Sequence, residues 1–214
     1  MRVFPNNTFR CLIVYKVISE KLIDKSIEIQ IHNNEKIQLF LDINIRFIKF
    51  YKEPYDLTVI EITKEDFDIL DNVFFLDFDV DYSKGYEQYI NSDVFALGFP
   101  LGDSNNVVYG SGKINAMKTY FEFEHNIATN IGFSGSPVVS LKSFNIIGVH
   151  KCGEYAEYLN VGIFIGFVVE DLKGQPYILQ LEEERNYIIG KIDIKEKILK
   201  IHLIGMKKII MRKK

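Results

Sequence analysis

Apolar and polar residues alternate along much of this chain, and this alternation restricts the fold more than any other feature. Before residue 63 the alternating segments are SIEIQIH, KIQLFLD, IRFIKFY and LTVIEI. A period of two residues is typical of strands with one buried face. After residue 92, glycine turns separate six further segments: DVFALGFP, VVYGSGKINAM, TYFEFEHNIAT, SPVVSL, FNIIGVHKC and LNVGIFIGFVV. We therefore expect an all-β fold of short antiparallel strands, arranged as a barrel or a sandwich.

An acidic and less regular stretch at 65–89 separates the two strand-rich parts. We predict an N-terminal domain at 1–85 that includes this linker, a second domain at 86–181, and a C-terminal extension at 182–214. The segment VVEDLKG at 168–174 predicts a short helix. The amphipathic, basic end of the extension indicates a solvated charged tail, with a membrane-surface or partner contact as the alternative.

Composition excludes several classes of function. The 214 residues are 47% hydrophobic, which suffices for one or two small domains. A net charge of −3 argues against a nucleic-acid-binding surface, and no apolar run is long enough for an integral membrane segment. Two cysteines are too few for a disulfide framework, so we expect a cytoplasmic protein. Four scattered histidines predict no metal site, and we expect no cofactor.

The glycine-rich turn IGFSGSPVV at 131–139 contains Ser134. Glycines beside a serine allow a sharp turn and leave amide groups free to face a ligand, as an acyl-transfer enzyme requires. An ordinary turn hydroxyl is the alternative. A nucleophilic serine also needs a base and an orienting carboxylate. Asp56 begins the strand-like segment YDLTVIEI, a position where aspartate is usually a simple turn residue.

Four motifs occur in a fixed order: GFPLG at 98–102, GFSGSP at 132–137, NIIGVHKCG at 145–153 and NVGIFI at 160–165. From about residue 9 to residue 173 the chain resembles the trypsin-like serine peptidases, especially their HtrA-like and glutamyl endopeptidase branches. The resemblance implies two antiparallel, six-stranded-type β-barrels. It also implies Ser134 as nucleophile, Asp56 as orienting acid, and the amides of Gly132 and Ser134 as oxyanion hole. Phe133 replaces the aspartate of zymogen-activated members, so activation by a freed N-terminus is not expected.

The same resemblance implies a substrate pocket formed by Thr129, His150 and Gly153. In glutamyl endopeptidases a hydroxyl residue and a histidine at the first two positions hold the carboxylate of a substrate glutamate, so we expect cleavage after acidic residues. His150 would act as an imidazolium there. His125 could shape the same wall. A core histidine is the alternative interpretation of His150.

The base of the family is a histidine about forty residues before the aspartate, and Lys16 occupies that position here. His32 lies only 24 residues before Asp56. A lysine beside Asp56 stays protonated, so it is a poor base, and a working dyad of Ser134 and Lys16 is the alternative. The glycine-rich strand that precedes the base motif is also missing, which predicts a first barrel incomplete at its N-terminus.

These observations lead to three hypotheses about function. The first is an endopeptidase with impaired activity, acting on a peptide or protein substrate. The second is an inactive pseudopeptidase that binds peptides or proteins. The third is a β-rich interaction protein unrelated to the peptidases.

Overall fold

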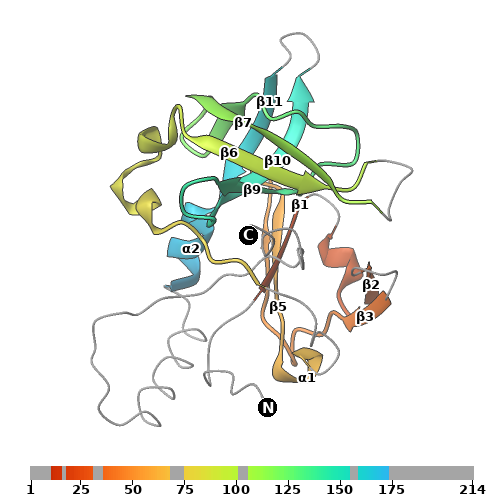
Figure 1. The fold of residues 1–214 in the computed structure, drawn as a ribbon. Helices are drawn as coiled ribbons and strands as arrows, with labels where there is room; N and C mark the ends of the chain where they lie inside the picture. Colours follow the sequence, from red (N-terminus) through yellow and green to blue (C-terminus); the bar gives the residue numbers. More distant parts are fainter. Residues whose placement is uncertain are drawn as a thin grey trace, which may run out of the picture.

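The structure is a computed structural model that describes residues 11–15, 18–30, 36–67, 75–100, 106–154 and 159–173. Within these ranges the fold is mostly β, as the alternation predicts, and the paired strands are antiparallel. Figure 1 shows two parts, an open N-terminal sheet and a closed C-terminal barrel. No helix in the described ranges is long and apolar enough to cross a membrane.

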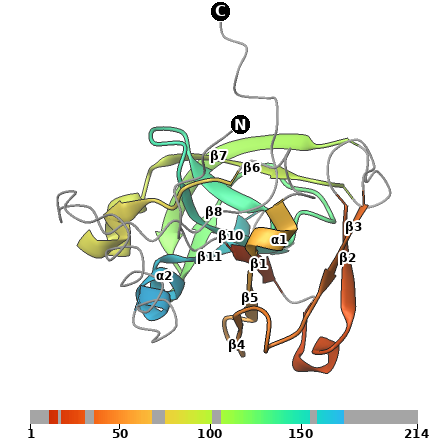
Figure 2. The same cartoon turned by 90° about the horizontal axis from the view of Figure 1, so that it is seen from below.

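The N-terminal half contains a three-stranded sheet in the order β1-β5-β4 and a separate hairpin of β2 and β3. Figure 2 shows the hairpin beside the sheet. Alternation in β3 buries Ile37 and Leu39, which share a hydrophobic cluster with Ile60 and Ile62 at the end of the sheet's central strand. The strands are β1 (Cys11–Tyr15), β2 (Ser26–Gln30), β3 (Lys36–Phe40), β4 (Ile48–Tyr51) and β5 (Leu57–Glu61).

The sequence predicts an incomplete barrel for this half, and the described part of it shows a three-stranded sheet and a separate hairpin instead of a closed barrel. A barrel requires a continuous ladder of backbone hydrogen bonds, whereas among the described strands β2 and β3 pair only with each other. The hairpin therefore joins the sheet through side-chain packing instead of strand pairing. The predicted gap at the N-terminus and the extension at 182–214 both lie outside the described residues.

The C-terminal half is a closed six-stranded barrel in the order β10-β11-β8-β7-β6-β9. Its core includes Phe123, Phe133 and Phe164. Helix α2 (Gly166–Lys173) follows the last strand and includes most of the predicted helical segment. The barrel strands are β6 (Asp93–Gly98), β7 (Val108–Met117), β8 (Glu122–His125), β9 (Pro137–Ser140), β10 (Ile146–Glu154) and β11 (Leu159–Phe164).

Short helical turns occupy much of the acidic stretch between the two halves. They are α1 (Lys64–Phe67), η3 (Val80–Lys84) and η4 (Tyr86–Tyr89), while η1 (Glu20–Leu22) lies earlier. Asp79 holds this stretch against the barrel, because its carboxylate accepts hydrogen bonds from the Asp81 amide, the Tyr89 hydroxyl and the Ser143 hydroxyl. The linker is therefore tied to the turn between β9 and β10.

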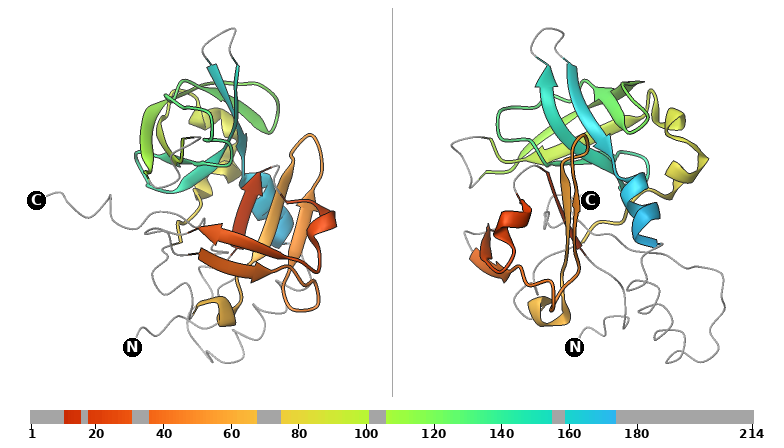
Figure 3. Two further views of the ribbon diagram at one scale, coloured as in Figure 1. Left: turned by 90° about the vertical axis from the view of Figure 1, so that its right-hand side faces the viewer. Right: turned by 180° about the vertical axis from the view of Figure 1, so that it is seen from behind.

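One hydrophobic cluster joins the two halves. It contains Cys11 and Ile13 of β1 and Val59 of β5, together with barrel residues such as Phe95 and Ile163. Helix α2 reaches from the barrel alongside the sheet (Figure 3). There Asp171 accepts hydrogen bonds from Lys49 and Tyr51 of β4. The open sheet thus depends on the barrel and α2 to cover its second face.

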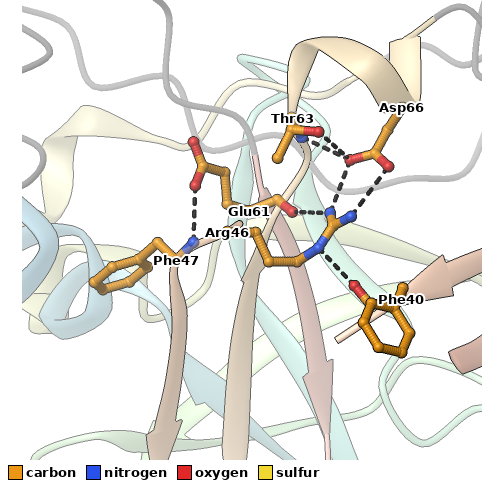
Figure 4. Close-up of polar contacts among 6 residues, drawn as sticks. All are labelled: Phe40, Arg46, Phe47, Glu61, Thr63 and Asp66. Atoms are coloured by element: carbon orange, nitrogen blue, oxygen red, sulfur yellow. Dashed lines mark hydrogen bonds and ion pairs between the residues drawn. The ribbon is translucent and has the colours of Figure 1, made fainter. Parts of the chain in front are cut away.

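Arg46 links the separate parts of the N-terminal half (Figure 4). Its guanidinium donates to the carbonyl oxygens of Phe40 at 2.8 Å and Glu61 at 2.9 Å, and it forms a two-pronged ion pair with Asp66 at 2.8 and 3.2 Å. Asp66 also accepts hydrogen bonds from the amide and hydroxyl of Thr63. The Arg46 and Asp66 side chains are 6% and 12% exposed, so the pair is shielded from water.

We expect Arg46→Ala to lower the free energy of unfolding by about 3–5 kcal/mol, because it leaves the buried Asp66 carboxylate without its counter-charge and removes the donor to the Phe40 and Glu61 carbonyl oxygens. Lys36→Ala is the matched control, since Lys36 pairs with Glu28 at the surface, and it should cost less than about 1 kcal/mol. Urea denaturation of both variants measures the difference. Equal effects would contradict the assignment.

Candidate active site

Ser134 lies in the turn between β8 and β9, where Gly132 and Gly135 have φ angles of 104° and 90°. This left-handed region suits glycine because a side chain would be strained there. Neighbouring amides are bonded: Phe133 donates to the Asn130 carbonyl and Gly135 to the His150 carbonyl.

The amides of Gly132 and Ser134 differ from those neighbours. Neither makes a hydrogen bond within the described part of the chain. Among the described residues, the turn therefore offers two donors without an acceptor, two residues apart, beside an exposed hydroxyl. Such donors can stabilise a developing oxyanion.

Phe133 anchors this turn. Its side chain is 1% exposed and packs in the barrel core. It lies against Gly98, where an added Cβ would come within 2.9 Å of the Phe133 ring. Burial of this apolar side chain holds the turn against the barrel.

The hydroxyl of Ser134 donates to the carbonyl oxygen of Lys151 at 3.0 Å. The Lys151 ammonium is itself paired with Glu122 at 2.6 Å. No described side chain forms a hydrogen bond with the Ser134 hydroxyl. The two basic residues considered from the sequence, Lys16 and His32, lie outside the described residues.

Asp56 closes the turn between β4 and β5 with a φ of 54°. Its carboxylate makes no hydrogen bond or ion pair with another described residue. The neighbouring Tyr55 holds the turn against the barrel: its ring centroid lies 4.6 Å from that of Phe121 and 4.4 Å from that of Phe167. Figure 3 shows the tip of this hairpin reaching the barrel strands. No hydrogen bond between Asp56 and Ser134 is found in the described ranges.

His150 is paired with His125 inside the barrel. The Nε2 of His125 lies 3.2 Å from the Nδ1 of His150, and the Ile127 amide donates to the Nδ1 of His125. An amide can only donate, so the Nδ1 of His125 is unprotonated and its Nε2 carries the proton that reaches His150. His150 must then carry its own proton on Nε2.

The Nε2 of His150 is the ring nitrogen that faces away from His125, in a residue that is 3% exposed. No described group forms a hydrogen bond with it, and no fully buried side-chain nitrogen in the described ranges lacks a partner. Burial lowers the pKa of His150 to about 4, and burial with repulsion from His150 lowers the pKa of His125 to about 3. At neutral pH His150 therefore presents a neutral N–H donor, whereas the sequence analysis assumed an imidazolium.

Thr129 belongs to the same network. Its hydroxyl donates to the Oδ1 of Asn160 at 2.9 Å, and the Nδ2 of Asn160 donates to the Ile127 carbonyl at 2.8 Å. The carbonyl can only accept, which fixes the orientation of the Asn160 amide. The Thr129 oxygen is therefore left as an acceptor.

Strand β10 brings the third predicted pocket residue to this network. Gly153 pairs with Asn160 across the β10–β11 ladder. The pairing of β10 with β9 ends at Val149, so in the described residues Cys152 and Gly153 pair with β11 alone. Both are exposed. This segment, the open edge of β10 (Cys152–Glu154), begins one residue after the carbonyl that binds Ser134.

Sequence reasoning missed four of the residues in this arrangement: Tyr55, Glu122, Lys151 and Asn160. A polar residue in the otherwise apolar segment LNVGIF was a signal for Asn160. No group of three or more potential metal ligands occurs among the described residues.

No protein-family model matches the chain, and no curated protein matches it in sequence. Solved structures resemble it at low identity. The serine endoprotease from Yersinia pestis gives a TM-score of 0.53 at 15% identity, covering 79% of this chain and 54% of that one. The serine protease domain of the Sesbania mosaic virus polyprotein gives 0.50 at 14% identity, covering 75% and 78%. The tobacco etch virus protease gives 0.53 at 14%, covering 80% and 70%.

These likenesses show the fold. The chain has a chymotrypsin-like fold, in which its C-terminal half is a closed barrel. It spans about half the length of the Yersinia protein. The coarse expectation of a trypsin-like fold is thereby confirmed.

The buried histidine pair predicts loss of stability in mild acid. Below pH 6.5 each imidazole of the unfolded chain binds a proton, whereas the folded rings, with pKa values of about 3 and 4, do not. The free energy of unfolding should fall by roughly 1.4 kcal/mol per pH unit for each ring between pH 6.5 and pH 4. Urea denaturation at several pH values measures this slope.

The variant His125→Gln tests the assignment, because it keeps a donor and an acceptor beside His150 but removes one ring. The slope over this pH range should then be about half as steep. An unchanged slope would show that other groups cause the acid sensitivity.

Proposed function

We propose that this chain binds extended peptides in the manner of a trypsin-like serine endopeptidase, and that its hydrolysis of peptide bonds through an acyl-enzyme on Ser134 is impaired. The observation that carries this proposal is the open edge of β10 beside Ser134 and the two unoccupied amides of its turn. An extended peptide can add to such an edge by backbone hydrogen bonds. Its carbonyl oxygen would then face the amides of Gly132 and Ser134.

Impairment follows from the residue at the position of the base. In the acylation step the Ser134 oxygen attacks the peptide carbonyl, and its proton must pass to a base and then to the leaving amine. A lysine with its ordinary pKa is protonated at neutral pH, so it cannot accept that proton. Loss of the base in a serine peptidase lowers turnover on the order of 10⁶-fold, with a residual 10³–10⁴ over water.

The pocket of Thr129 and His150 suggests which side chain the peptide places there. The neutral site offers one donor, the Nε2 proton of His150, and one acceptor, the Thr129 oxygen. A primary carboxamide matches both groups. A carboxylate matches the donor alone, unless His150 takes up a proton. In place of a general preference for acidic residues, we propose that the pocket prefers a glutamine side chain at neutral pH. Its affinity for a glutamate side chain should rise relative to glutamine as the pH falls.

A second candidate is a pseudopeptidase that binds peptides or proteins without cleaving them. The hydrogen bond from the Ser134 hydroxyl to the Lys151 carbonyl favours it, because this proton points to an acceptor that cannot act as a base. Both candidates share the same peptide or protein partner. We also propose a cytoplasmic location, because Cys11 and Cys152 are not joined in a disulfide.

Labelling with a fluorophosphonate separates the two candidates. The unmodified chain should react slowly, and Lys16→His should raise the labelling rate at least about 100-fold, because a neutral imidazole can accept the serine proton. Ser134→Ala provides the background rate. Rapid labelling of the unmodified chain that Ser134→Ala abolishes would show that the base is assigned wrongly.

Peptides that differ only in their last side chain test the pocket. At pH 7.5 we expect a glutamine peptide to bind about two- to tenfold more tightly than a norleucine peptide, the range of one neutral hydrogen bond. The ratio of glutamate to glutamine affinity should rise as pH falls to 5.5, since carboxylate binding takes up a proton at His150. Calorimetry measures both ratios.

Two variants of Thr129 provide the matched control. Thr129→Ser keeps the hydroxyl and should preserve the preference for glutamine, whereas Thr129→Val removes the acceptor and should reduce it. His150→Ala should abolish the preference at both pH values. Equal affinity of the unmodified chain for all three peptides would overturn the pocket assignment.

A further inference from the structure

We propose that Tyr55 is a positioning residue that sets the place of Asp56 relative to Ser134, and that it acts through the β7–β8 corner (Tyr120–Glu122). This inference rests on the proposed function, because it takes Asp56 as the orienting acid of Ser134 chemistry. Contacts connect the turn that contains Asp56, through Tyr55 and this corner, to Ser134.

Aromatic rings from both ends of the barrel half fix the turn. Tyr55 lies between Phe121 at the corner and Phe167 in the first turn of α2, with centroid distances of 4.6 and 4.4 Å. Its hydroxyl is 2.8 Å from the hydroxyl of Tyr120. Aromatic pairs of this kind contribute beyond the area that they bury. Tyr55 is thus fixed in position and orientation.

The position of Asp56 depends on the neighbouring residue, Tyr55. Asp56 has a left-handed backbone conformation, which is uncommon for a residue other than glycine. Its carboxylate has no partner among the described residues, so no contact of its own side chain holds it in place there. The adjacent Tyr55 supplies the tertiary contacts of this turn with the barrel.

The same corner also holds the nucleophile loop. Glu122 follows Phe121 directly, and its carboxylate binds the Lys151 ammonium at 2.6 Å. The side chains of Glu122 and Lys151 are 10% and 25% exposed, so their pairing is only weakly screened by water. The Lys151 carbonyl in turn accepts the Ser134 hydroxyl. Asp56 and Ser134 are 78 positions apart in the sequence. The turn of Asp56 contacts Phe121 through Tyr55, and the loop of Ser134 contacts the next residue, Glu122, through Lys151.

A double-mutant cycle tests whether Tyr55 acts through Asp56. In the Lys16→His background, Tyr55→Ala and Asp56→Ala should each lower the fluorophosphonate labelling rate by about 10–100-fold, the range expected for a displaced catalytic group. The double variant should be no slower than Asp56→Ala alone. If the fold-losses in labelling rate of the two single variants multiply in the double variant, the proposal is overturned, because Tyr55 then acts independently of Asp56.

Two single variants control for folding. Tyr55→Phe keeps the stacked ring and loses only the exposed hydroxyl contact, so its labelling rate should stay within about threefold of the background. Tyr109→Ala removes an exposed tyrosine from the same barrel, one that stacks on Phe95 and has no ring contact with Tyr55. It should leave the rate unchanged. A loss in Tyr109→Ala equal to that in Tyr55→Ala would overturn the positioning role.

Amide chemical shifts of the full chain provide a readout that needs no activity. We expect Tyr55→Ala to shift the ¹H–¹⁵N signals of Glu122, Lys151 and Ser134, and Tyr55→Phe to leave them in place. If the Lys16→His variant does not react with the fluorophosphonate at all, the proposed hydrolytic function is wrong. The chemical shifts still show whether Tyr55 is coupled to Lys151 and Ser134. Unshifted signals of Lys151 and Ser134 in a folded Tyr55→Ala protein would overturn the inference.

Discussion

Strand β5 is buried on both faces, and the arrangement of the two halves depends on this burial. One face, with Ile60, belongs to the small cluster under the β2–β3 hairpin. The other face, with Leu57 and Val59, belongs to the cluster shared with the barrel and α2. A strand with two apolar faces is stable only between two layers. The barrel therefore serves as the second layer for the open sheet, and the turn of Asp56 at the start of β5 is fixed by the same contact.

The elements that sequence reasoning predicted well are those set by local chemistry. Period-two alternation identified β3, in which Ile37 and Leu39 are buried and their neighbours exposed. The glycines around Ser134 indicated a turn because the observed positive φ angles favour glycine. Likewise, the segment at 168–174 predicted most of α2. Each of these signals lies within a few residues of the feature that it predicts.

The features that sequence reasoning missed depend on contacts between distant residues. Asn160 meets Thr129 because β11 pairs with β8 and β10 in a particular register. The neutral state of His150 follows from its burial beside His125, which no local pattern encodes. Whether the N-terminal sheet closes also depends on which strand edges meet, so sequence alone could not give the open three-stranded sheet and separate hairpin that the described residues form. The roles of Tyr55 and Glu122 likewise require the two halves to be in contact.

Cys152 gives the molecule a useful property that is independent of any chemistry at Ser134. The sequence has two cysteines, of which Cys11 is fully buried and Cys152 is exposed on the open edge of β10. A thiol-reactive dye should therefore attach at a single place, because a reagent reaches an exposed thiol far more readily than a buried one. The dye would sit beside Gly153, where an added strand must pass. Occupancy of that edge could then be followed by fluorescence in a chain without any engineered residue.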